Sequence, residues 1–212
     1  MRFGYRWPNE HNAVKNNCRT VAAYENYARR YAANVSPQPS ESGASALRRL
    51  ADALPAEGRV LEIGSGPGWD ADFLEGLGVP VHRTDVTAEF LNFQAERGLR
   101  ADALNVLTDE IAGTYDGILM LCVLQHFERT ELDGVLHKLA KALSEGGALL
   151  VSHPVGDDEF WEHTTSGDYR VVRWSSATLD DRLHRAGFMV AWDKCEDGDD
   201  GPWRAVLARK TS

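Results

Sequence analysis

The stretch RVLEIGSGPGWD, residues 59–70, decides the fold of this chain. Its apolar start predicts a buried strand over residues 59–63, and three glycines follow at once: Gly64, Gly66 and Gly68. Glycines directly behind a strand let the backbone turn tightly and approach a ligand closely, as in loops that receive nucleotides. Apolar residues on one helical face follow over 69–77. The stretch therefore predicts a strand–loop–helix unit with a ligand at the loop.

The glycine spacing departs from two familiar nucleotide loops. A dinucleotide-binding loop reads G-x-G-x-x-G, and here Trp69 stands where the third glycine would be. An indole at that position crowds the close helix–strand contact that glycine allows. The phosphate-binding pattern G-x-x-x-x-G-K-[ST] is absent from the sequence. The loop thus favours close backbone contact with a ligand over tight binding of a pyrophosphate.

Three acidic residues accompany the loop. Asp85 ends the next predicted strand, 21 residues after Gly64, where a carboxylate can accept hydrogen bonds from both ribose hydroxyls. Asp102 ends a short third strand, at a place suited to the exocyclic amine of adenine. Glu62 lies inside the apolar run and needs a partner, because an unpaired buried carboxylate is costly.

Strand-like and helical runs alternate along the chain, which predicts a doubly wound α/β sheet with ligands at the carboxyl ends of its strands. The linker-like segment 34–45 separates amino-terminal lid helices and linker (1–44) from the main domain (45–212), within a single-domain protein overall. The further predicted strands are 79–84, a short one ending near 102, 115–123, 148–152 and two closing strands around EDGDDGP; the further predicted helices are 87–97, 131–143 and 175–186.

Composition and charge narrow the possible partners. At 212 residues, one domain with a substantial core is expected. The formal net charge is −9, and residues 41–212 alone carry −13, so the acidic main domain disfavours a nucleic-acid partner. No apolar run approaches the roughly 20 residues of a membrane span, and no export signal precedes the domain. The three distant cysteines suit a cytoplasmic protein and give no metal-ligand spacing.

Five motifs in order resemble the class I S-adenosylmethionine-dependent methyltransferases of the small-molecule type. They are VLEIGSGPG (60–68), DVTAEFL (85–91), ADALN (101–105), YDGILMLCVLQHF (115–127) and LHKLAKALSEGGALLVS (136–152). The resemblance implies a Rossmann-like, mostly parallel sheet of seven strands with a helical lid. It also implies S-adenosylmethionine as cofactor and S-adenosylhomocysteine as product.

The same resemblance implies a cofactor cradle. The glycine loop would contact the methionine and ribose, Asp85 the ribose hydroxyls, Val86 the adenine, Asp102 and Ala103 the adenine edge, and Leu121 the methionine amine. The predicted cofactor-binding residues are Tyr24, Tyr31, Glu62, Gly64, Ser65, Gly66, Gly68, Asp85, Val86, Asp102, Ala103 and Leu121.

Tyr24, Tyr27 and Tyr31 fall on one face of a predicted helix. One interpretation is simple packing onto the sheet. The other is a lid that closes over the cofactor through Tyr24 and Tyr31, which the resemblance supports because many small-molecule methyltransferases carry a similar helix.

Methyl transfer from a sulfonium depends mainly on alignment of the reacting atoms, and a nearby base can assist it. Two histidines follow predicted strands at the ligand edge: His126 is predicted as the base, and His153 as a catalytic or substrate-contacting residue. The segment 153–174 is predicted to select the substrate, with Trp161 and Arg170 as its contacts, although a solvated loop is the simpler reading.

The resulting hypothesis is a cytoplasmic enzyme that methylates an oxygen or nitrogen atom of a small molecule, in secondary metabolism or detoxification. The motif NPPY of enzymes that methylate bases or glutamine is replaced by LCVLQ (121–125). A carboxylate methyltransferase acting on a modified peptide stays open, as does a non-catalytic S-adenosylmethionine-binding module. A nicotinamide-dependent oxidoreductase is disfavoured by Trp69. The expected partners are a small-molecule or short peptide substrate, with no nucleic acid, no membrane and no metal; the expected state is a monomer or homodimer.

Overall fold

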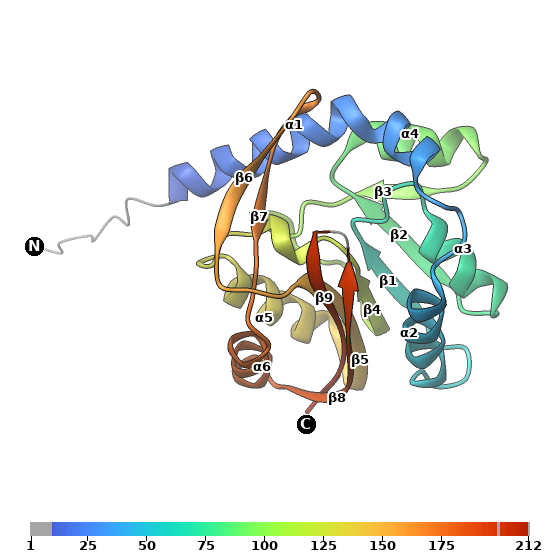
Figure 1. The fold of residues 1–212 in the computed structure, drawn as a ribbon. Helices are drawn as coiled ribbons and strands as arrows, with labels where there is room; N and C mark the ends of the chain where they lie inside the picture. The colour runs from blue at the N-terminus through green and yellow to red at the C-terminus, as the bar shows by residue number, and fades with distance from the viewer. Residues whose placement is uncertain (1–9, 199, 212) are drawn as a thin grey trace, which may run out of the picture.

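A computed structural model describes residues 10–198 and 200–211 (Figure 1). Its elements are α1 (Glu10–Asn34), α2 (Glu41–Asp52), β1 (Val60–Ile63), α3 (Trp69–Gly76), β2 (Val81–Asp85), α4 (Ala88–Glu96), β3 (Ala101–Ala103), β4 (Tyr115–Met120), the 3₁₀ turn η1 (Leu124–His126), α5 (Leu132–Ala142), β5 (Leu143–Pro154), β6 (Glu159–Thr164), β7 (Gly167–Val172), α6 (Ser176–Arg185), β8 (Phe188–Gly198) and β9 (Gly201–Lys210).

The central sheet has seven strands in the order β3-β2-β1-β4-β5-β9-β8. The first five are parallel, and β9 and β8 close the sheet as an antiparallel pair. The predicted fold class, a doubly wound and mostly parallel sheet, is confirmed. The strand order reverses between β1 and β4, and in such sheets ligands bind in the crevice outside the strand ends at this switch point.

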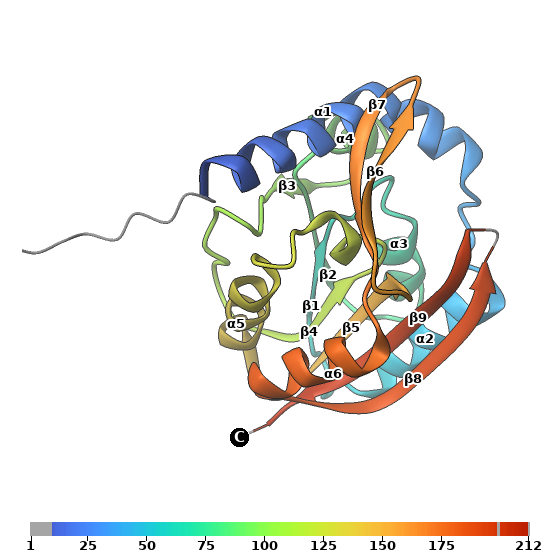
Figure 2. The same ribbon diagram turned by 60° about the vertical axis from the view of Figure 1, so that its left-hand side comes forward.

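Helices cover both faces of the sheet (Figure 2). On one face Val60 of β1 packs in a cluster with Leu50 of α2 and Leu74 of α3. On the other face Leu61 of β1 belongs to a larger cluster with α5 and α6, which contribute residues such as Leu136 and Leu183. Because both faces are covered, β1 is buried throughout, as its continuous apolar run predicts.

The helix α1 lies across the edge of the sheet where the parallel strands end, and the β6–β7 hairpin crosses against it (Figures 1 and 2). The backbone N–H of Arg170 donates to Thr20 Oγ1 at 3.1 Å, and Asn26 Nδ2 donates to the Ser166 carbonyl at 3.1 Å. On its other side α1 reaches α4, where Arg29 Nη2 lies 2.7 Å from Glu96 Oε1. The hairpin and α4 thus hold α1 from two sides.

The predicted domain boundary at 44/45 falls inside α2. This helix begins at Glu41, and Ser40 caps it by accepting from the Gly43 N–H at 3.1 Å. Its apolar side belongs to the sheet domain, so the segment between α1 and α2 is the shorter run 35–40.

None of the helices within residues 10–198 and 200–211 is both long enough and apolar enough to cross a membrane. No group of three or more His, Cys, Asp or Glu side chains in the same residues is arranged to hold a metal ion.

Candidate active site

A cavity of about 500 Å³ lies at the switch point, beneath α1. Its floor comes from the glycine loop and from the segments that follow β2, β3 and β4, and its roof from α1 and the residues between α1 and α2. Concave sites of this size hold cofactors and small molecules. The lid predicted from the tyrosine spacing therefore covers a space at the carboxyl ends of the strands without filling it.

The glycine loop brings its backbone to the cavity at two of its three glycines. Gly64 and Gly66 line the cavity with positive φ angles of 71° and 51°. Gly68 does not line it, although the resemblance placed it against the cofactor. A Cβ at Gly68 would lie 2.7 Å from Arg83 Nη1 and 2.8 Å from Gln94 Oε1. Gly68 instead allows α3 to pack closely against its neighbours. Ser65 lines the cavity and accepts from Gln94 Nε2 at 2.8 Å.

Asp85 lies in the cavity wall at the end of β2, as predicted. Its Oδ2 accepts from the Gly66 N–H and its Oδ1 from the Thr87 N–H, both at 2.8 Å. Burial raises the pKa of Asp85, and these backbone hydrogen bonds act against that rise. Each carboxylate oxygen can accept a further hydrogen bond, so the group is oriented for a pair of neighbouring hydroxyls. Val86 and Leu121 also line the cavity, in agreement with their predicted positions.

Asp70 is a site residue that the sequence reasoning missed. It lies in the first turn of α3 and lines the cavity, and burial raises its pKa to about 6. Glu62, which was predicted to bind the cofactor, does not line the cavity. Burial, followed by the charge of Asp70, raises the pKa of Glu62, and its buried Oε2 has no hydrogen-bond partner among the described residues. The sequence did contain a signal for Asp70, namely an acidic residue two positions after the last glycine of the loop.

Asp102 and Ala103 do not line the cavity, so their positions lend no support to the predicted contact with adenine. Asp102 Oδ2 lies 2.9 Å from His82 Nε2, and its carboxylate also pairs with Arg100. These hydrogen bonds, that of His82 first, lower the pKa of Asp102. The cavity wall after β3 is formed by the next residues, Leu104, Asn105 and Val106. The reason is strand alternation: the side chain of Asp102 is directed to β2 rather than to the ligand space.

Tyr24 and Tyr31 line the cavity from α1, as predicted, while Tyr27 does not. The Tyr31 ring packs edge-on against Phe90 with centroids 5.7 Å apart, and the Tyr24 ring lies 6.4 Å from that of Phe90. Burial raises the pKa of both hydroxyl groups well above the usual value. Both tyrosines therefore stay protonated and act as hydrogen-bonding groups in the cavity wall.

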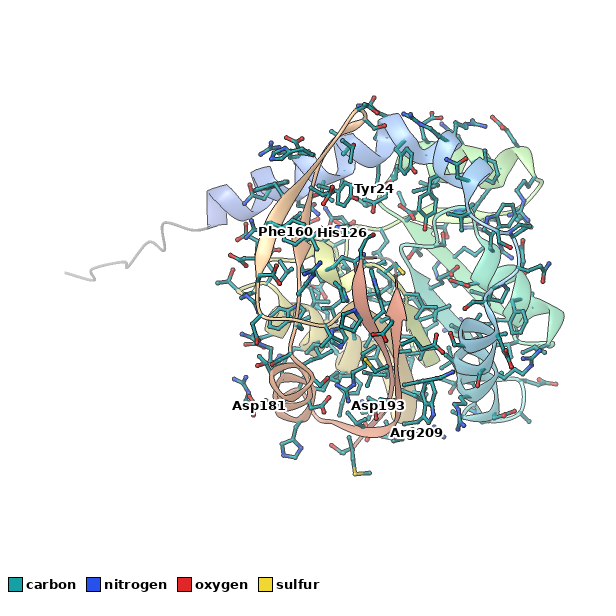
Figure 3. All side chains as sticks on the ribbon, viewed as in Figure 1. Tyr24, His126, Phe160, Asp181, Asp193 and Arg209 are labelled. Carbon is teal, nitrogen blue, oxygen red and sulfur yellow. The ribbon has the colours of Figure 1, made fainter. Side chains whose placement is uncertain are left out.

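His126 lines the cavity and faces Tyr24 (Figure 3). Its Nε2 is 3.0 Å from Tyr24 Oη, and its Nδ1 is 2.7 Å from the Arg170 carbonyl oxygen. Cys122, with φ of 55°, turns the chain from β4 into η1 and places this ring. Burial lowers the pKa of His126 to about 4, so the imidazole is neutral near pH 7.

The structure places His153 away from the cavity, so its position lends no support to the predicted catalytic role or substrate contact. Its ring is fully buried within β5 and is absent from the cavity lining. His153 Nδ1 lies 3.1 Å from the Pro154 carbonyl oxygen, and burial lowers its pKa to about 4. The strand continues to Pro154, past its predicted end at 152, so His153 belongs to the packed strand and not to a loop after it.

Trp161 and Arg170 do not line the cavity either, so their positions lend no support to the predicted contact with substrate. The segment around them is a β-hairpin rather than a loop. The Arg19 guanidinium lies 4.3 Å from the centroid of Trp161, and Arg170 Nη2 pairs with Glu159 at 2.9 Å. Among the described residues, none of the hairpin lines the cavity. The hairpin acts on the site through α1 and through the Arg170 carbonyl.

The doubly wound sheet and a ligand cavity at its switch point define a class of nucleotide-cofactor enzyme. Residues 27–191 match the family model described as a methyltransferase domain, and the chain belongs to this family. The predictions of a class I methyltransferase and of an enzyme are confirmed. No curated protein matches the sequence.

Solved structures of methyltransferases share the fold. The Burkholderia thailandensis 1,6-didemethyltoxoflavin-N1-methyltransferase is 19% identical, with a TM-score of 0.71 over 100% of this chain and 94% of its own. The CcbJ methyltransferase of Streptomyces caelestis is 18% identical, with a TM-score of 0.71 over 90% of this chain and 98% of its own. DhpI in its SAH complex is 20% identical, with a TM-score of 0.71 over 95% and 98%. At these identities the likeness shows the fold.

The cofactor predicted for the chain, S-adenosylmethionine, is that of this class of methyltransferase. The residues present fit it. Gly66 leaves its part of the cavity floor open to a ligand, since a Cβ there would meet only Phe90, at 4.0 Å, and Asp85 offers two oriented carboxylate oxygens. Asp70 adds a negative group in the same wall, where a cationic ligand would be stabilised.

Proposed function

We propose that this chain transfers a methyl group from S-adenosylmethionine to an oxygen or nitrogen atom of a small molecule whose reacting part is uncharged. The observation that carries the proposal is that one cavity brings together two sets of groups. Asp85 and Asp70 accompany the glycine loop in its wall, and the hydrogen-bonded pair Tyr24–His126 lines the same cavity. The first set suits an adenosyl cation, and the second suits an acceptor with a proton to lose.

The part of the cavity near the glycine loop would hold the cofactor. Asp85 would accept from the ribose hydroxyls, the backbone at Gly64 and Gly66 would lie against the cofactor, and Asp70 would face its positive charge. Tyr31 and Phe90 would cover the bound molecule from the lid side. When bound, the cofactor supplies an electrophilic methyl group, and the protein's task is to align the acceptor with it.

The part of the cavity near His126 would hold the acceptor. His126 is neutral and lines the cavity, so it can take the proton that an N–H or O–H acceptor loses. The cavity lining also includes apolar side chains such as Val21, Val123 and Phe127, together with the neutral polar groups of Asn17 and Asn105. This lining suits a partly apolar acceptor, such as a phenol or an aromatic amine.

The charge of the cavity argues against a carboxylate acceptor. No lysine or arginine of the described residues lines the cavity. A carboxylate entering it would be buried without a cationic partner, which is costly. The lid arginines point elsewhere: Arg19 pairs with Asp168 and Arg29 with Glu96. Methylation of a neutral oxygen or nitrogen is therefore the better-supported function.

Isothermal titration with S-adenosylmethionine, S-adenosylhomocysteine and NADH tests the donor, and transfer of a tritiated methyl group to phenols, aromatic amines and carboxylic acids tests the acceptor. We expect binding of the two adenosyl ligands, no binding of NADH, and transfer to neutral acceptors. His126→Asn should keep donor binding and lower kcat by about 100-fold. Binding of NADH alone, or transfer to carboxylic acids alone, would overturn the proposal.

The other predictions are part of the same proposal. We place the catalytic domain over 41–212 with α1 as its lid, and we expect a cytoplasmic enzyme of secondary metabolism or detoxification that acts on a small molecule or short peptide as a monomer or homodimer. Size-exclusion chromatography with light scattering measures the oligomeric state directly.

A further inference from the structure

His126 carries a defined tautomer. Its Nδ1 lies 2.7 Å from the backbone carbonyl oxygen of Arg170, which can only accept, so Nδ1 bears the proton. Its Nε2 lies 3.0 Å from Tyr24 Oη and 3.4 Å from the side-chain amide nitrogen of Gln125, which can only donate. Nε2 is therefore unprotonated, and the Tyr24 hydroxyl donates to it.

The Tyr24 ring is fixed by aromatic neighbours from three different elements. Its centroid lies 5.3 Å from that of His126, 5.7 Å from that of Tyr169 on β7 and 6.4 Å from that of Phe90 on α4. Both Tyr24 and His126 line the cavity. A hydroxyl held in this way has a set direction, and its oxygen keeps lone pairs for a further donor.

We propose that Tyr24 relays the acceptor's proton to His126, rather than serving only to cover the cofactor. In this arrangement the acceptor's N–H or O–H donates to Tyr24 Oη, and Tyr24 Oη donates to His126 Nε2. The inference rests on the proposed function, in which His126 is the final proton acceptor. It gives the predicted lid tyrosine a part in the chemistry.

The relay balances protons and electrons. The acceptor's bond to hydrogen breaks and its proton binds the Tyr24 oxygen, while the original Tyr24 proton moves to Nε2. The electron pair left on the acceptor forms the bond to the methyl carbon, and the pair of the broken carbon–sulfur bond stays on sulfur. The charge that remains is the imidazolium of His126, whose Nδ1–H stays bonded to the Arg170 carbonyl.

The position of that carbonyl gives the hairpin a role in the site. Arg170 belongs to β7, and its N–H donates to Thr20 Oγ1 on α1 at 3.1 Å. One peptide segment of the hairpin therefore both holds the lid and selects the tautomer of His126. In the relay, the hairpin must be docked before Nε2 can receive a proton.

Tyr24→Phe tests the relay because it removes one hydroxyl group and keeps the ring. Tyr27→Phe is the matched control, since it removes a hydroxyl from the same helix outside the cavity. The readouts are the ¹⁵N resonances of the His126 ring in the full chain, and kcat and KM with an acceptor found in the transfer screen.

We expect the Nδ1–H tautomer in the wild-type spectrum and a shift of the Nε2 resonance in Tyr24→Phe. We also expect kcat to fall at least about 10-fold in Tyr24→Phe, with donor Kd unchanged within about twofold. Tyr27→Phe should match the wild type in each readout.

An Nε2–H tautomer, an unchanged kcat in Tyr24→Phe, or a loss of donor binding that accounts for the whole effect would overturn the relay. Failure of the wild-type chain to bind S-adenosylmethionine would instead overturn the proposed function and the relay with it. The two failures are distinguished by the wild-type titration.

Discussion

Glu25 of the lid and Ala88 of α4 are joined by a 2.7 Å hydrogen bond from the Ala88 N–H to Glu25 Oε1, and the Glu89 N–H donates to Oε2 at 2.9 Å. A lid carboxylate thus occupies the amino terminus of the helix that starts just after Asp85. This is the favourable end of a helix for a negative charge. Closure of α1 is therefore linked to the segment that carries the proposed ribose-binding residue.

Glu25→Ala is expected to weaken donor binding, because the lid would lose its cap on α4. A lost cap is worth about 1 kcal/mol, which corresponds to a roughly fivefold rise in the Kd of S-adenosylmethionine. Isothermal titration measures this Kd. Glu25→Gln keeps one acceptor oxygen, so its Kd should lie between those of the wild type and Glu25→Ala. Equal affinity in all three proteins would show that this contact does not govern closure.

Asp85→Asn and Asp102→Asn distinguish the donor contact that the structure supports, at Asp85, from the adenine contact that the sequence predicts at Asp102. Asp85 accepts two backbone hydrogen bonds in the cavity wall, while Asp102 pairs with His82 outside it. Loss of a charged hydrogen-bond acceptor at Asp85 should raise the donor Kd by about 10-fold or more. Asp102→Asn should leave the donor Kd within about twofold of the wild-type value. The reverse order in a titration would restore the adenine contact predicted for Asp102.

Donor binding is expected to depend on the ionisation of Asp70. Burial raises the pKa of this carboxyl to about 6, so it is charged above that pH and neutral below it. A cationic donor should therefore bind more tightly as the pH rises through about 6, and up to about tenfold more weakly per pH unit below it. Titrations between about pH 5 and pH 8 measure this slope. The same slope in Asp70→Asn would assign it to another group.

Gly66→Ala and Gly68→Ala should affect different properties. Both glycines have positive φ, and a side chain there costs about 1–2 kcal/mol. At Gly68 the added Cβ also meets Arg83 and Gln94 at 2.7 and 2.8 Å, whereas at Gly66 its nearest neighbour is Phe90 at 4.0 Å. Denaturant unfolding should show the larger loss of stability for Gly68→Ala. Titration should show the larger loss of donor affinity for Gly66→Ala, since Gly66 lines the cavity and Gly68 does not.

The sequence was most informative where a residue's place follows from the strand it ends. The apolar run before Gly64 identifies β1, and the position of Asp85 at the end of β2 follows from the parallel order of the strands. His126 could be assigned to the cavity for the same reason, because it follows β4 directly. These positions depend on local pattern and topology alone.

Side chains whose direction depends on tertiary packing could not be placed in this way. Asp102 lies in β3 but turns to His82, and His153 lies near the end of β5 with its ring fully buried. Trp161 and Arg170 lie on a hairpin whose docking against α1 depends on contacts distant in sequence, such as that between Arg170 and Thr20. Asp70 was missed because its burial arises from tertiary packing.

The two attachments of α1 also bear on how the products leave. Its contacts with α4 come from Glu25 and Arg29, and its contacts with the hairpin come from Thr20 and Asn26. Because these residues alternate along one helix, α1 must release both neighbours before the cavity opens. Since the ion pairs of Arg29 weaken with salt, a higher ionic strength should speed the departure of the spent donor and the methylated product.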